Sequence, residues 1–164
     1  MTYEIGGARG TIKAHEAILK KIHSWAESVG CDVLLADARV VFGRDHLETA
    51  VRHASRARAA GTMAARSVSM EALRYLSGQR QVADAIRTAG IRPGTRGVAI
   101  AVFGKPRLDE VVALVGWSRD DAVLEPKGKS LRTLGISEAE SRTLPASPRP
   151  DLALEKVALL GREK

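Results

Sequence analysis

Cysteine and aromatic residues are scarce in this sequence, and each shortage excludes a class of protein. The single cysteine, Cys31, rules out an internal disulfide and a zinc site built from several cysteines, and its apolar setting, VGCDVLLAD, predicts a plain thiol in the core. Because Phe, Trp and Tyr make up only 4% of the chain, a core must be built from Ala, Val, Leu and Ile.

Long hydrophobic runs and targeting signals are also missing. No apolar run approaches the length that spans a bilayer. The first residues, MTYEIGGARGT, do not show the basic and then apolar pattern of a signal peptide. We therefore expect a cytoplasmic protein that makes no use of a membrane.

Recognisable catalytic motifs are absent as well. The sequence contains no G-x-S-x-G, no P-loop, no GxGxxG after a strand and no HExxH. Of its four histidines, His46 and His53 stand seven residues apart on one predicted helix, where Glu48 is out of phase to complete a metal site. The sequence predicts no metal, no cofactor and no enzymatic activity, although an enzyme of unfamiliar type stays open as an alternative.

Positive charge, in contrast, is plentiful and unevenly placed. Residues 44–96 hold ten arginines, four acidic residues and no lysine, so this segment carries +6 of the net charge of +7. Arginine presents a planar fork of donors that pairs with phosphates and stacks on bases. The excess indicates a surface that binds a polyanion, and a solvated charged face is the plainer alternative.

The hydrophobic pattern predicts a mixed chain of helices and short strands. Strands are expected at 2–5 and 9–12, as a hairpin or one broken strand, and at 31–41 and 98–104; helices are expected at 13–28, 44–60, 69–77, 82–89, 107–117 and 151–161, the last after a proline-rich linker at 144–150. Because strands and helices do not alternate regularly, we expect an α+β fold: a single domain, residues 1–164, in which about six helices pack on a small antiparallel or mixed sheet.

The most informative stretch is SMEALRYLSGQRQVADAIRTAGI, residues 69–91. It predicts two short helices separated by Gly78, which supplies a left-handed helix stop. Val82, Ile86 and Ala89 are expected to form the apolar face of the second helix. Arginine or glutamine stands on nearly every exposed turn, which is compatible with binding DNA, a protein or RNA.

A DNA-binding helix-turn-helix is one alternative for this stretch. The turn at 77–79 has a suitable length, and 83–89 would be the recognition helix. The outer face of that helix offers Arg80, Asp84, Arg87 and Thr88 but no asparagine. No dimerisation helix is evident either.

Three segments together resemble a known family. GRDHLETAVRHASRA, SVSMEALRYLSGQRQVADAIRTAGI and GVAIAVFG are similar to the small tRNA-binding regulatory subunit of the KEOPS complex, the TPRKB-like family. The resemblance covers residues 40–104 and, more loosely, the tail LALEKVALL; its specific part is 75–81. Small departures are Asp45 where the family often has Glu, Gln79 where Glu is common, and a longer linker, LPASPRP.

The resemblance implies a mixed α/β fold without activity of its own. Members of this family bind the small atypical kinase (PRPK-like) subunit through one helical face, and that subunit contacts the threonylcarbamoyl transferase. The complex makes threonylcarbamoyladenosine at position 37 of tRNAs that read codons starting with adenine. Archaeal members also recruit the tRNA by its single-stranded CCA end, and an arginine-rich, lysine-poor chain suits an archaeal source.

A CCA end calls for a few fork donors and a flat surface. The candidate RNA-binding residues are Arg44, Arg74 and Arg80 as phosphate donors, His46 and Gln81 as readers of base edges, and Tyr75 as a stacking platform. The start of the helix that holds His46 also favours a phosphate. The alternative for Arg80 and Gln81 is that they tie the turn between two helices to neighbouring carbonyls, and for Tyr75 that it packs at the core boundary.

The kinase subunit is expected to contact a helical surface of small and apolar residues. Two helices, at 111–115 and 152–160, provide the candidates, which are Val111, Val112, Val115, Leu152, Val157 and Leu160. Ordinary core packing is the alternative for each of them. A contact of standard size would bury about 1,600 Å² in total.

Overall fold

The computed structural model describes residues 1–137 and 149–162. Four strands form one antiparallel sheet in the order β2-β3-β1-β4, with β1 at Tyr3–Arg9, β2 at Asp32–Asp37, β3 at Gly97–Phe103 and β4 at Ser118–Arg119. The α-helices of the described residues are α1 (His15–Val29), α2 (Arg44–Ala60), α3 (Val68–Ser77), α4 (Val82–Ala89), α5 (Leu108–Leu114) and α7 (Arg149–Arg162). Three short 3-10 helices connect them: η1 (Ala38–Val40), η2 (Asp121–Leu124) and η3 (Leu131–Leu134).

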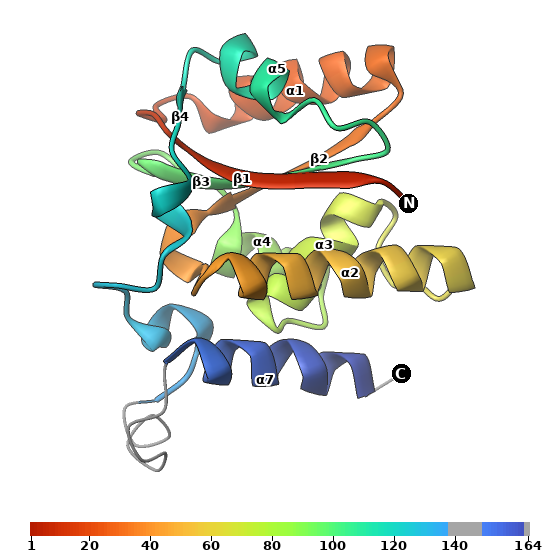
Figure 1. The fold of residues 1–164 in the computed structure, drawn as a ribbon, viewed down its shortest axis with the longest axis vertical. Coiled ribbons are helices and arrows are strands. Elements are labelled where there is room, and N and C mark those ends of the chain that lie inside the picture. The colour runs from red at the N-terminus through yellow and green to blue at the C-terminus, as the bar shows by residue number, and fades with distance from the viewer. Residues whose placement is uncertain (138–148, 163–164) are drawn as a thin grey trace.

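The helices cover both faces of the sheet in layers (Figure 1). α1 and α5 lie on one face, α2, α3 and α4 lie on the other, and α7 packs outside α2 and α3. This arrangement confirms a single α+β domain with a small antiparallel sheet. The predicted linker falls largely within 138–148, outside the described residues. None of the helices in the described ranges is both long and apolar enough to cross a membrane.

The central strand β3 divides the core into two halves, because successive side chains of a strand point to opposite faces. Ala101 pairs with Ile5 of β1 and with Leu34 of β2, and all three belong to the larger core under α2 and α3. Its neighbours Ile100 and Val102 belong to the smaller core under α1 and α5. All five side chains are at most 4% exposed.

β1 is one continuous strand through Gly6 and Gly7, so neither a hairpin nor a break is present. The two glycines let the chain after α5 lie directly on the strand. A Cβ at Gly7 would lie 2.4 Å from the Val123 side chain, and a Cβ at Gly6 would lie 2.7 Å from the guanidinium of Arg119. The glycines are therefore needed for this close approach.

The strand expected at 31–41 ends at Asp37, four residues early. The Asp37 carboxylate accepts a hydrogen bond from the backbone N–H of Arg39, and this turn begins η1. The local side-chain bond therefore competes with strand extension, as aspartate commonly does.

Most of the expected helix ends are confirmed. Gly30 ends α1 and Gly78 ends α3, both in the left-handed region. The Ser67 hydroxyl caps α3 by accepting from the N–H of Met70. α2 begins after Gly43, without a hydrogen bond from a capping side chain.

The apolar face expected for α4 is wrong at Ile86, whose side chain is 50% exposed. The buried residues of this helix are Ala85 and Ala89, while Val82 is half-buried. Ile86 lies one residue, about 100° of helical turn, away from that stripe. Small alanines let α4 pack closely against α3, so the larger isoleucine remains outside.

Candidate functional site

His46 lies in the core and does not face solvent. Its ring is fully buried, Nδ1 accepts the backbone N–H of Phe42 at 3.1 Å, and Nε2 lies 3.1 Å from the carbonyl oxygen of Leu76. Since a carbonyl only accepts, Nε2 carries the proton and the ring is neutral. Burial lowers the pKa of His46 to about 4. The interpretation of His46 as a reader of base edges is therefore corrected: it ties η1 and α2 to the end of α3.

Arg74 and Tyr75 are buried too, at 5% and 3% exposure, so neither offers a surface to RNA. The Arg74 guanidinium donates to the Glu71 carboxylate at 2.9 Å and to the carbonyl oxygen of Arg80 at 2.5 Å. The Tyr75 ring packs on His53, with ring centroids 5.1 Å apart. α7 covers both rings, since a Cβ at Gly161 would lie 3.1 Å from His53. Periodicity placed Tyr75 correctly on its helix but did not reveal that α7 closes over it.

The remaining candidate RNA-binding residues, Arg44, Arg80 and Gln81, are exposed. Arg44 begins α2 and lies 3.9 Å from the Asp121 carboxylate. Gln81 precedes α4, and the carbonyl oxygen of Arg80 is held by Arg74. The structure thus places these three side chains where a ligand can reach them.

The residues expected to bind the kinase subunit mostly face the interior. Val111 and Val112 are buried in the smaller core, and Val157 and Leu160 in the larger one. Val115 and Leu152 are half-buried, and each packs against one of these cores. α7 docks on α2 and α3 of its own chain, which is why its apolar stripe is occupied. These helices therefore supply core packing, the alternative noted above, and the interpretation as a partner surface is corrected.

α4 presents a face that fits DNA poorly. Arg87, which would point to the bases, is paired with Asp84. The exposed Ile86 stands beside this pair. An arginine already paired with a carboxylate and an apolar side chain offer little hydrogen bonding to base edges.

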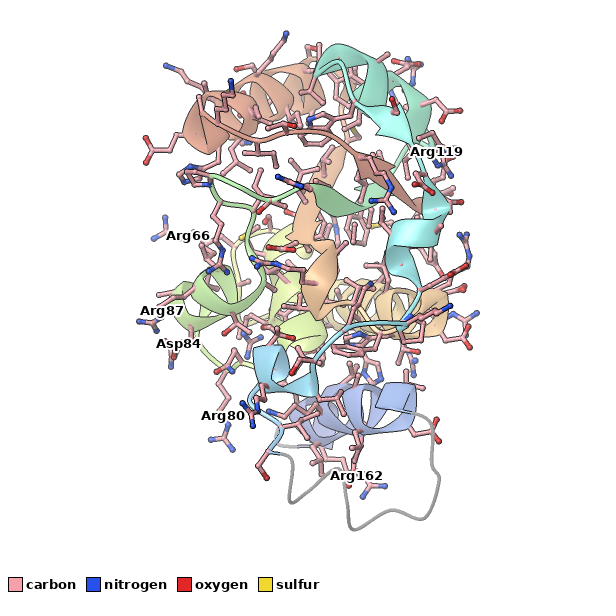
Figure 2. The ribbon with its side chains drawn as sticks, turned by 90° about the vertical axis from the view of Figure 1, so that its left-hand side faces the viewer. Arg66, Arg80, Asp84, Arg87, Arg119 and Arg162 are labelled. Atoms are coloured by element: carbon pink, nitrogen blue, oxygen red, sulfur yellow. The ribbon has the colours of Figure 1, made fainter. Side chains whose placement is uncertain are left out.

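The arginines of 44–96 are spread over the molecule and do not form one patch. Arg44 stands at the start of α2 and Arg56 near its end, about 18 Å away along the axis. In Figure 2, which looks onto the end of the molecule where β1 ends, Arg66, Arg80 and Arg87 lie at one margin. Arg44 instead shares the Asp121 carboxylate with Arg119, which lies toward the other margin. The high density of arginines in this stretch of sequence therefore did not predict a dense patch of arginines on the surface.

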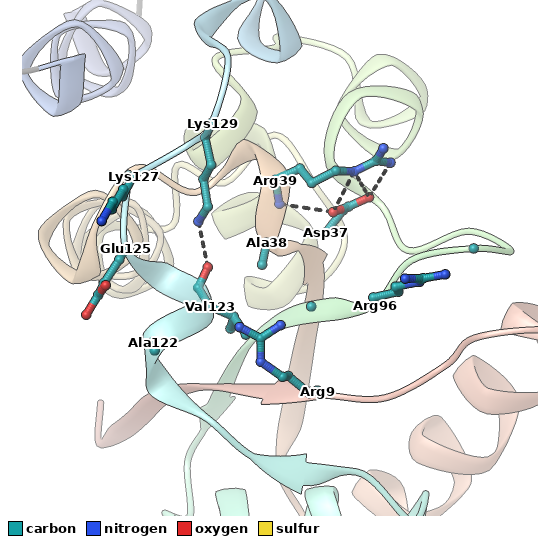
Figure 3. Close-up of a pocket in the computed structure, with 12 residues that line it drawn as sticks. Arg9, Asp37, Ala38, Arg39, Arg96, Ala122, Val123, Glu125, Lys127 and Lys129 are labelled. Atoms are coloured by element: carbon teal, nitrogen blue, oxygen red, sulfur yellow. Dashed lines mark hydrogen bonds and ion pairs between the residues drawn. The ribbon is translucent and has the colours of Figure 1, made fainter.

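A different group of cations does converge, around a pocket of about 550 Å³ at this end of the sheet. The pocket lies between the last residue of β1, the start of β3, η1 and the segment that follows η2 (Figure 3). Its cationic lining residues are Arg9, Arg39, Arg96, Lys127 and Lys129. Asp37 and Glu125 are the only carboxylates among its lining residues, so the lining carries +3.

Lys129 fixes one wall of the pocket. Its ammonium group donates to the carbonyl oxygens of Val41 and Val123, both at 2.6 Å, and so joins the end of η1 to η2. Burial lowers the pKa of Lys129 to about 8, which leaves the side chain mostly protonated at neutral pH.

Sequence reasoning missed this pocket because its cations come from separate parts of the chain. Only Arg96 belongs to the arginine-rich segment, and Arg9 and Lys129 are 120 residues apart. Each looks like an ordinary surface charge in its own context. A β-sheet that brings residues 9, 39 and 96 to one end is what joins them. Within the described residues, no group of His, Cys, Asp and Glu is arranged to hold a metal ion.

Fold and surface define a single-domain α+β protein with a cationic pocket at one end of its sheet and further exposed arginines spread over its surface. Comparison with protein families then identifies the family of the chain: residues 11–125 match the family described as kinase binding protein CGI-121. The match spans more than half of the chain, and the chain belongs to this family. It bears out the resemblance to the TPRKB-like subunit. No curated protein matches the chain.

Proposed function

We propose that this chain is the non-catalytic subunit of a KEOPS complex that binds the PRPK-like kinase subunit and recruits tRNA through its 3′ CCA end. In this role it serves the synthesis of threonylcarbamoyladenosine at position 37 and reaches the transferase subunit only indirectly. The observation that carries the proposal is the match of residues 11–125 to a kinase-binding family. The exposed Arg44, Arg80 and Gln81 support the RNA part. A cytoplasmic location and an archaeal source stay predictions.

For the kinase contact, exposed apolar side chains within the matched range are the best candidates. Leu19 on α1 and Ile86 on α4 are 42% and 50% exposed. Both lie within 11–125, whereas the equally exposed Leu159 lies outside it. Interfaces commonly centre on a few such anchors.

The kinase contact is tested by titrating the purified PRPK-like subunit into Leu19→Glu, Ile86→Glu and Leu159→Glu variants in a calorimeter. We expect at least one of the first two to raise the Kd more than tenfold, because a charge at an apolar anchor is desolvated without a partner. Leu159→Glu, the matched control, should change the Kd less than twofold. Equal affinity of all three variants would move the contact to another surface, and no binding by the unaltered chain would overturn the kinase proposal.

The RNA part is tested by fluorescence anisotropy at near-physiological salt with intact tRNA, the same tRNA lacking its CCA end, and a DNA duplex. We expect intact tRNA to bind best. Arg80→Ala should weaken its binding by about 1–3 kcal/mol if this arginine contacts RNA. Arg66→Ala, which removes another exposed arginine, should have a much smaller effect.

Two outcomes would count against this proposal. Equal binding of the three nucleic acids would reduce the surface to a nonspecific polyanion site, and a preference for the duplex would favour the DNA alternative. If Arg80→Ala lowers the free energy of unfolding and leaves the affinity of the folded protein unchanged, Arg80 only stabilises the turn before α4.

A further inference from the structure

The cationic pocket at the end of the sheet has more positive charge than the fold itself neutralises. Asp37 is 2% exposed, and its carboxylate accepts hydrogen bonds from Nε and Nη2 of Arg39 and from the hydroxyl of Thr95. The Asp37 carboxylate therefore already has hydrogen-bond partners within the protein. The other terminal nitrogen of Arg39, Nη1, has no partner among the described residues, and the side chain is 67% exposed.

Two further cations of the pocket lack any partner in the described parts of the chain. The side chains of Arg96 and Lys127 make no hydrogen bond or ion pair there, and both are exposed. Arg9 is paired with Asp120 at the rim. Folding thus places several cationic side chains around one cavity and leaves some of their N–H groups without a hydrogen-bond acceptor. Because like charges repel, this arrangement costs free energy unless an anion binds.

The floor between these cations is made of small apolar groups. Ala38, Gly97, Ala122 and Val123 line it. A Cβ at Gly97 would lie 3.3 Å from Ala38 and 3.4 Å from Val123, so the floor is closely packed there. Figure 3 shows Arg9, Arg39 and Arg96 among the residues that line the same pocket.

We propose that this pocket binds a nucleotide through its phosphate groups, with the guanidinium groups of Arg39 and Arg96 as its principal donors. Guanidinium forks pair with phosphate oxygens through parallel hydrogen bonds. No aromatic side chain is among the lining residues, so a base stacks on an arginine plane or lies on the small-residue floor. The volume, about 550 Å³, falls within the range of small-molecule sites.

Two sources can supply this chemistry: the end of a single-stranded RNA and a free nucleotide. With an RNA end as its ligand the site rests on the proposed tRNA recruitment, whereas with a free nucleotide it does not; neither Arg80 nor Gln81 lines it. If tRNA recruitment fails and the pocket still binds a free nucleotide, only the proposed function falls. The experiment below separates the two.

The test is a titration of the full chain followed by the amide signals of Arg39, Gly94 and Gly97 in two-dimensional NMR. The probes are ATP, AMP, the trinucleotide CCA, and adenosine as the probe without phosphate. We expect saturable shifts at these amides with the phosphate-bearing probes and none with adenosine. Tighter binding of CCA than of ATP would assign the site to an RNA end, and the reverse order to a free nucleotide.

Charge reversal at the pocket supplies the second part of the test. Arg96→Glu and Lys127→Glu should each raise the Kd of the best probe at least tenfold, because each replaces an unpaired donor by a repelling carboxylate. Arg66→Glu makes the same change at an exposed arginine outside the pocket and should alter the Kd less than twofold. Lys127 lies in an exposed loop, so its variant keeps the test valid if Arg96→Glu does not fold.

Three results would overturn the proposal. The first is no saturable shift with any phosphate-bearing probe, and the second is shifts that map away from the pocket. The third is an equal loss of binding in Arg66→Glu and Arg96→Glu, which would mean diffuse attraction to surface charge.

Discussion

Replacing Glu71 by alanine is expected to lower the free energy of unfolding by about 3–5 kcal/mol. The Glu71 side chain is fully buried, and one of its oxygens, Oε2, accepts three hydrogen bonds. They come from the backbone N–H of Ala64 at 3.0 Å, that of Ala65 at 2.8 Å and the Arg74 guanidinium at 2.9 Å. Alanine would remove all three acceptor contacts and leave Arg74 as a buried charge without its carboxylate.

This loss is large because the pair holds two junctions at once. Glu71 fixes the loop between α2 and α3, and Arg74 fixes the turn between α3 and α4 through the carbonyl oxygen of Arg80. A domain of this size is stable by about 5–15 kcal/mol, so the variant would retain only part of that margin. Urea denaturation at 25 °C measures the change, provided that the slope of the transition is compared as well.

A double variant and a matched control make the result specific. Removing Arg74 together with Glu71 should cost clearly less than the sum of the single changes, because no unpaired charge is left behind. Glu48→Ala removes a partly exposed glutamate paired with Arg52 and should cost less than about 1 kcal/mol. Equal effects of Glu48→Ala and Glu71→Ala would contradict the buried-pair explanation.

Local signals in the sequence predicted the helices and strands well. They predicted poorly which side chains of each helix are covered by the rest of the fold. The apolar spacing of α1 and the stop at Gly78 depend on residues a few positions apart, and both are confirmed. The helical spacing of Val82, Ile86 and Ala89 predicts an inward-facing Ile86. Its exposure follows from how closely the alanines of α4 approach α3, a distance that the sequence of α4 alone does not contain.

The candidate site shows even more clearly that local sequence does not contain the tertiary contacts of a residue. His46 stands in one motif-like segment and Arg74 and Tyr75 in another, yet each is engaged by a residue at least three positions away. The partner of His46, Leu76, is 30 positions distant. Conversely, the cations of the pocket have no motif, because antiparallel pairing brings the end of β1 next to the start of β3. Polar residues that cluster in sequence here stabilise the core, whereas those that cluster in space form the pocket.

Burial of neutral His46 also predicts how the protein responds to acid. Its pKa is lowered from 6.5 to about 4 in the folded state, chiefly by desolvation, so the unfolded chain binds more protons between these values. Stability that is fully present above pH 6.5 is therefore lost as the pH falls toward 4. At 1.36 kcal/mol per pKa unit, this histidine alone accounts for about 3 kcal/mol of destabilisation at pH 4.

Hydrogen bonding gives the same direction. Protonation of Nδ1 would turn the acceptor of the Phe42 N–H into a donor that faces it, so the imidazolium ion fits the site badly. Denaturation of the wild type and of His46→Asn between pH 4 and 7 checks the prediction. Asparagine does not titrate in this range, so the variant should lose about 3 kcal/mol less over the interval, whatever its stability at pH 7.

The exposed His23 is the matched control, since it lies on the surface of α1, 3.3 Å from Glu27. His23→Asn should leave the acid dependence of the wild type nearly unchanged. If His46→Asn and the wild type instead lose stability in parallel, His46 is protonated in the folded protein. The hydrogen bonds that join η1 and α2 to the end of α3 would then have to tolerate a charged ring. A neutral His46 with two hydrogen bonds would be the wrong description of the folded protein.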